Sequence, residues 1–77
     1  MNMNDFVKNF ENAIGGIQTG SLNAKTEFSS IEQWDSLAAL SILAMVSTEY
    51  GVELAAEELK NSKTIEDLFH IMEAKKQ

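Results

Sequence analysis

The sequence predicts an all-α fold: a small four-helix bundle with a long loop between helices one and two and a short third helix. Apolar residues recur at intervals of three and four along the chain, which is the spacing of helices that bury one face. The polar stretch between the first two of these segments shows no alternation that would indicate a strand, and the chain contains no proline. At 77 residues we expect a single domain over residues 1–77.

The first helix is expected to begin near Asn4, which suits an N-cap, with Asp5 at the positive end of the helix dipole. The pair Gly15-Gly16 is expected to end this helix or to weaken its last turn. Its apolar stripe consists of Phe6, Val7, Phe10, Ile14 and Ile17.

A polar stretch rich in Ser, Thr and Asn follows, over residues 18–33. Phe28, Ile31 and Trp34 interrupt it, and we expect these side chains to pin the loop onto the core. Because structureless loops of this length are uncommon in compact domains, a turn or short helix is expected within it.

The second helix is the clearest element. Ser36 is expected to be its N-cap, with Asp35 beside the positive end of the dipole, and Gly51 suits the left-handed residue after its last turn. Its inward face is predicted to be Ala39, Ile42, Leu43, Val46 and Tyr50. A second apolar line of Leu37, Leu40 and Ala44 is expected to be partly exposed, either as ordinary apolar surface or as a docking surface.

Two further helices complete the expected bundle. Residues 53–59 are consistent with a brief helix led by acidic residues. The last helix is expected to open at Thr64, with Asp67 in the position of a capping-box acid. Its inward stripe is predicted to be Ile65, Leu68, Phe69 and Met72.

Composition excludes several classes of function. Twelve acidic residues against six lysines, with no arginine, give a formal net charge of −6, so the surface would repel nucleic acid and would attract basic partners. There is no membrane-spanning stretch and no cysteine, and His70 stands alone, so we expect no membrane insertion and no metal site. No residues form a credible catalytic arrangement. We therefore expect a cytoplasmic, monomeric protein that is not an enzyme.

Ser36 is the residue that best suits covalent attachment. At a helix N-terminus its hydroxyl lies among unpaired backbone donors, which is a favourable environment for a phosphate group. Asp35 beside it could help an attaching enzyme hold a divalent metal ion. The alternative interpretation is that Ser36 is simply a cap.

From Phe28 to about Met72 the sequence resembles the acyl carrier proteins. The resemblance rests on Asp35-Ser36-Leu37, the apolar spacing that follows, and the segments 49–54, 57–58 and 64–68. It implies an acyl-carrier-like four-helix bundle in which Ser36 carries 4′-phosphopantetheine, installed from coenzyme A by a phosphopantetheinyl transferase. The terminal thiol of that arm holds acyl groups as thioesters, typically in fatty-acid and other lipid biosynthesis.

One departure from that family concerns the second helix. Carriers of fatty-acid synthesis usually show several acids along it, whereas positions 36–48 here are uncharged. We therefore expect a carrier dedicated to one pathway, whose acyl-loading and acyl-processing enzymes have basic or apolar docking patches. The expected partner-binding residues are Asp35, Leu37, Leu40, Ala44, Glu49, Glu53, Glu57 and Glu58.

A different class of function is also consistent with the sequence. The chain could be an unmodified helical interaction module that docks on a partner through the second helix. Replacing Ser36 with alanine separates the two hypotheses, because a carrier would lose cargo loading while an interaction module would keep its affinity.

Overall fold

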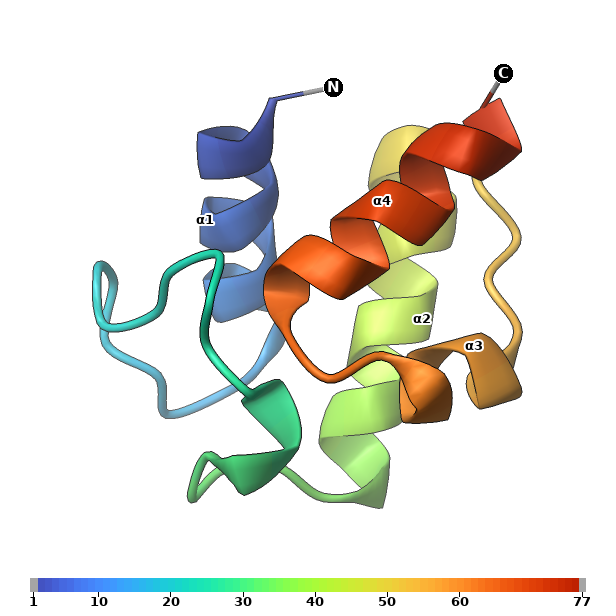
Figure 1. Cartoon of the computed structure of the whole chain (residues 1–77). Coiled ribbons are helices and arrows are strands. Elements are labelled where there is room, and N and C mark those ends of the chain that lie inside the picture. Colours follow the sequence, from blue (N-terminus) through green and yellow to red (C-terminus); the bar gives the residue numbers. More distant parts are fainter. Residues whose placement is uncertain (1, 77) are drawn as a thin grey trace.

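The computed structural model describes residues 2–76 and shows a bundle of helices with a long loop between the first two long helices (Figure 1). Helix α1 packs against α2 and α4, and the short α3 packs against the same two helices. The prediction of an all-α four-helix fold with a long first loop and a short third helix is thus confirmed. The elements are α1 (Met3–Ala13), the 3-10 helix η1 (Phe28–Ser30), α2 (Ser36–Tyr50), α3 (Ala56–Asn61) and α4 (Ile65–Lys76).

The core lies where these helices meet. The predicted stripe of the last helix is buried throughout. Of the stripe predicted for the first helix, all residues are buried except Ile17, which lies beyond the end of α1 and is half-buried. Aromatic rings link the elements: Phe6 of α1 lies 5.6 Å from Phe69 of α4, centroid to centroid. The buried apolar residues are Phe6, Val7, Phe10, Ile14, Phe28, Ala38, Ile42, Val46, Val52, Leu59, Ile65, Leu68, Phe69 and Met72.

Helix α1 begins earlier than predicted. Asn2, not Asn4, is its N-cap, and the Asn2 side chain accepts a hydrogen bond from the Asp5 N–H at 3.2 Å. The prediction of Asn4 was wrong because two asparagines suit the role, and the earlier one adds residues that bring Met3 against the core. The helix ends at Ala13, shortly before Gly15-Gly16.

The long loop is held to α1 by a buried carboxylate. Glu11 is 2% exposed, and its carboxylate oxygens accept hydrogen bonds from the N–H groups of Gly20 and Leu22 at 2.9–3.1 Å. Gly20 has φ +89°, a conformation that favours glycine. The expected short helix within the loop is η1, whose Phe28 enters the core.

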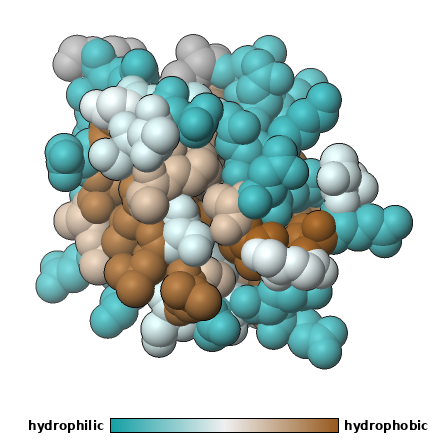
Figure 2. All heavy atoms as spheres, turned by 180° about the vertical axis from the view of Figure 1, so that it is seen from behind, coloured by the Kyte–Doolittle hydropathy of each residue, from teal (hydrophilic) through white to brown (hydrophobic). Residues whose placement is uncertain are grey.

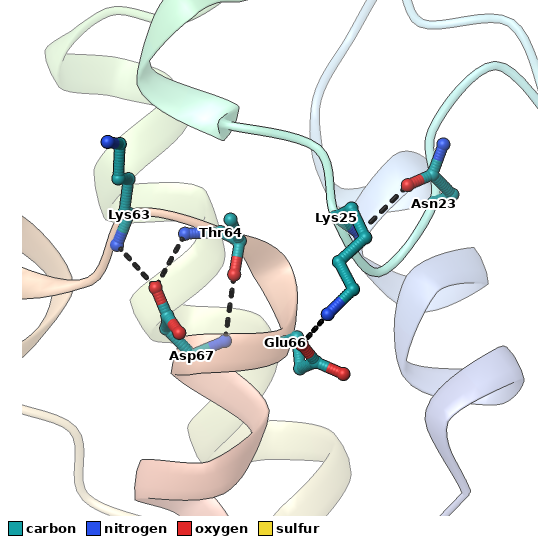
Figure 3. A network of polar contacts seen from close by, with 6 residues as sticks. All are labelled: Asn23, Lys25, Lys63, Thr64, Glu66 and Asp67. Carbon is teal, nitrogen blue, oxygen red and sulfur yellow. Dashed lines mark hydrogen bonds and ion pairs between the residues drawn. The ribbon is translucent and has the colours of Figure 1, made fainter.

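The same loop is joined to the start of α4. The N–H groups of Ile65 and Glu66 donate to the carbonyl oxygens of Thr26 and Ala24, at 3.2 and 2.9 Å. Lys25 forms an ion pair with Glu66 (Figure 3). The first N–H groups of α4, which no helix can satisfy internally, therefore find acceptors in the loop.

The predicted cap of the last helix is confirmed. The Asp67 N–H donates to Thr64 Oγ1 at 3.1 Å, and the Thr64 N–H donates to Asp67 Oδ2 at 3.1 Å (Figure 3). The Lys63 N–H donates to the same carboxylate oxygen at 3.2 Å. The bonds from Thr64 and then from Lys63 lower the pKa of Asp67 from its ordinary value.

Helix α3 is shorter than the acidic segment suggested. It begins at Ala56, after an extended Ala55 whose N–H donates to Glu58 Oε1 at 2.9 Å. Glu53 therefore lies outside the helix that it was expected to lead. Within residues 2–76, no helix has the length and apolar character needed to cross a lipid bilayer.

Candidate functional site

Asp35 and Ser36, which are neighbours at the start of α2, have different roles. Asp35 is the N-cap, and its Oδ1 accepts a hydrogen bond from the Ala38 N–H at 2.7 Å. Ser36 is the first residue of the helix itself, so its predicted capping role was wrong. Because the carboxylate of Asp35 performs the capping, the Ser36 side chain is exposed and makes no hydrogen bond with residues 2–76.

The first turn of α2 offers backbone donors next to this hydroxyl. The Ala38 and Ala39 N–H groups are satisfied by Asp35, through its side chain and its carbonyl oxygen respectively. The N–H groups of Ser36 and Leu37 have no acceptor in the part of the chain that the structure describes. Such donors, together with the helix dipole, favour a phosphate at this position, so the residues present fit a phosphodiester on Ser36 Oγ.

A pocket of about 620 Å³ opens beside Ser36, between η1, α2 and α3. Trp34 forms part of its wall and also pins the loop, because its ring stacks on Phe10 with centroids 6.3 Å apart and lies 4.9 Å from Phe28. Most of the remaining lining is apolar. The lining residues are Phe28, Ser29, Trp34, Asp35, Ser36, Ala39, Leu40, Leu43, Ala56, Leu59, Lys60 and Ser62.

An exposed apolar surface runs along α2 away from Ser36. Leu37 and Leu40 are 71% and 63% exposed, and Ala44 is exposed as well, as expected for the second apolar line. Figure 2, the view from behind, shows apolar side chains gathered at the lower left with hydrophilic ones around them; this corresponds to the lower right of Figure 1, where α2 and α3 lie. An exposed apolar surface of this kind is suited to contact with other proteins.

The inward face of α2 is rotated slightly from the predicted one. Ala38 is buried together with Ile42 and Val46, whereas the predicted Ala39, Leu43 and Tyr50 are only half-buried. The rotation directs Ala39 and Leu43 toward the pocket beside Ser36.

The acidic residues expected to bind partners are spread over several elements: Asp35 and Glu49 at the two ends of α2, Glu53 after it, and Glu57 and Glu58 on α3. Glu49 lies thirteen positions after Ser36 on α2, which places it about 20 Å away along the helix axis. Glu53 and Glu57 are exposed, Glu53 beyond the end of α2 and Glu57 on α3. The carboxylate of Glu58 already has partners within the chain: the Ala55 N–H donates a hydrogen bond to it, and Lys75 Nζ lies 3.1 Å from its Oε1. Both contacts lower the pKa of Glu58.

Sequence reasoning missed the polar residues of the pocket that come from other elements. Ser29 of η1, Lys60 of α3 and Ser62 reach the same cavity as Ser36. No local motif marks them, because they meet Ser36 only through the packing of η1 and α3 against α2.

Comparison with known proteins identifies a family. The family model described as "Phosphopantetheine attachment site" matches residues 13–71, which is more than half of the chain and includes the start of α2. No curated protein and no solved structure matches. Members of this family are modified by phosphopantetheinyl transferases. The chain therefore belongs to the phosphopantetheine attachment family of carrier domains, which are not catalytic and hold a covalent 4′-phosphopantetheine.

Proposed function

We propose that Ser36 holds the phosphopantetheine arm and that the protein carries acyl groups for a dedicated biosynthetic pathway. The arm supplies a terminal thiol on which an acyl group is held as a thioester. The observation that carries the proposal is the position of the Ser36 hydroxyl, exposed in the first turn of a 15-residue helix and beside a pocket. Backbone donors of that turn stabilise the charge of the phosphodiester.

The other serines of residues 2–76 suit this role less well. The hydroxyls of Ser21 and Ser62 donate to the carbonyl oxygens of Gln18 and Glu58. Ser41 is half-buried in the middle of α2, and Ser47 lies near its C-terminal end, where the dipole disfavours an anion. The remaining two, Ser29 and Ser30, belong to the three-residue η1.

The exposed surface of α2 favours partners that bind by apolar contact. Residues 36–48 carry no charge, and Leu37 and Leu40 project from this stretch into solvent. A basic patch on a partner would meet the acidic residues only at the ends of the helix, at Asp35 and Glu49. We infer partner enzymes with an apolar cleft for the two leucines, which is consistent with a carrier used by few enzymes.

Intact mass measurement tests the attachment site. The wild-type protein is incubated with coenzyme A, Mg²⁺ and a broad-specificity phosphopantetheinyl transferase, beside Ser36→Ala and the matched control Ser47→Ala. We expect wild type and Ser47→Ala to gain one phosphopantetheine and Ser36→Ala to gain none. A gain in Ser36→Ala would move the site elsewhere. No gain in folded wild type with two transferases of different selectivity would refute the proposal.

The docking of partners is tested by placing a charge on the exposed apolar surface formed by Leu37 and Leu40. Leu40→Glu should slow modification of Ser36 roughly tenfold or more, because a leucine buried in an interface contributes about 1.5–3 kcal/mol. Thr48→Glu, at an exposed position of the same helix, is the control and should leave the rate nearly unchanged. Circular dichroism checks that both variants are folded. Equal effects of the two variants would show that docking does not depend on Leu40.

A further inference from the structure

Lys60 of α3 is a positive charge at the edge of a largely apolar pocket. It is exposed to solvent and lines the same cavity as Ser36. No carboxylate in residues 2–76 lies within 4.0 Å of its Nζ, in contrast to Lys25 and Lys75, which pair with glutamates. In a protein of net charge −6, a lysine so placed is available to an anion that enters the pocket.

The surroundings of Lys60 strengthen such an attraction. Leu59 and Leu43 form part of the same wall, so an anion that enters the pocket loses part of its contact with water, and the ammonium group of Lys60 can replace that contact. The only other ionisable side chain of the lining is Asp35, whose carboxylate accepts the hydrogen bond that caps α2. The aliphatic stem of a lysine covers apolar surface while its ammonium group stays at the rim.

We propose that Lys60 binds an anionic group of the tethered arm and thereby holds the arm in the pocket between α2 and α3. The anion is either the phosphodiester on Ser36 or a carboxylate at the far end of the cargo. Both present oxygen acceptors to an ammonium group, so they share one chemistry. In the second case Lys60 would select dicarboxylic acyl groups over neutral ones. This inference rests on the proposed attachment at Ser36.

Nuclear magnetic resonance of the lysine side chains distinguishes the two sources. Four forms are compared: unmodified protein, protein with the bare arm, and protein loaded with butyryl or succinyl groups, which have the same number of carbons and differ in the terminal carboxylate. The signals of Lys60 Cε and Nζ are followed, with exposed Lys63, which is outside the pocket lining, as the internal control.

A shift at Lys60 larger than at Lys63 on addition of the bare arm assigns the phosphodiester as partner. A larger shift only in the succinyl form, absent in the butyryl form, assigns the cargo carboxylate. Lys60 signals that move no more than those of Lys63 in all three modified forms would overturn the proposal.

A second measurement uses the single tryptophan of the chain, which lines the pocket. Seating of the arm should change Trp34 emission in wild type and in Lys63→Gln, and should change it less in Lys60→Gln. Intact mass shows whether each protein is modified. If folded wild type gains no mass with either of the two transferases, both proposals are wrong. If all three proteins gain mass and show equal emission changes, only the role of Lys60 is wrong.

Discussion

The carboxylate of Asp35 closes the first turn of α2 through its hydrogen bond with the Ala38 N–H. Asp35→Ala should lower the free energy of unfolding by about 1 kcal/mol, which is typical for loss of an N-cap. Ser36→Ala should cost less, because the Ser36 hydroxyl makes no hydrogen bond with residues 2–76. Urea denaturation of the unmodified proteins measures both values. A larger cost for Ser36→Ala would mean that the serine is the cap.

Glu11 holds the long loop against α1, a role that the residues next to it in the sequence do not indicate. Its buried carboxylate accepts hydrogen bonds from Gly20 and Leu22, so Glu11→Ala leaves these N–H groups without their acceptor. Because hydrogen bonds to a charged group contribute about 1.5–3 kcal/mol, we expect a loss of stability in this range in urea denaturation. The control Glu49→Ala removes an exposed glutamate and should change stability much less. Equal losses would show that Glu11 does not hold the loop.

The candidate site was predictable only where its residues are adjacent in the sequence. Ser36, Leu37 and Leu40 follow from the pattern of one helix, since a helix fixes which of its own residues share a face. Lys60 and Ser29 belong to the same cavity but come from α3 and η1. Their approach to Ser36 depends on tertiary packing, which periodicity does not specify.

At the scale of elements, the start of α4 makes stability depend on pH. Backbone hydrogen bonds hold the pKa of Asp67 below its ordinary value of 3.8, and unfolding removes these bonds. The contribution is therefore fully present above that ordinary value and is lost as the pH falls through the lower pKa of the folded state. Asp67→Asn should lose less stability than wild type on acidification, measured by urea denaturation at several pH values.

The control for this effect is Glu57→Gln, which removes one exposed carboxylate from α3 without touching the cap of α4. It should retain the acid dependence of the wild type. Glu58, whose pKa is lowered by Ala55 N–H and by Lys75, keeps some acid dependence in every variant. Identical pH profiles for Asp67→Asn and wild type would contradict the role of Asp67.

The sequence predicts which segments form helices better than it predicts where each helix begins and ends or which of its faces is buried. The stripes of α1 and α4 were strong signals because each has one apolar face. Helix α2 is apolar on most sides, so the spacing did not show that Ala38 rather than Ala39 is buried. The start of α1 was ambiguous because Asn2 and Asn4 are both good capping residues.

At the scale of the whole molecule, the class of fold follows from the number of apolar stripes, while the path of the long loop does not. That path is set by contacts distant in sequence: Glu11 with Gly20, and the backbone of Ala24 and Thr26 with the start of α4. These contacts join the loop to two helices at once. The loop is therefore part of the packed structure that presents Ser36, and it should unfold together with the helices.

Trp34 provides the measurement of that cooperativity. Its ring stacks on Phe10 of α1 and contacts Phe28 of η1, so its fluorescence reports whether the loop and the first helix remain together. We expect the fluorescence transition and the loss of helical circular dichroism to coincide in urea, as in a two-state domain. Phe10→Leu should move both transitions to lower urea by the same amount, because one core supports both signals. A fluorescence change at lower urea than the helical transition would instead show that the loop detaches from an intact bundle.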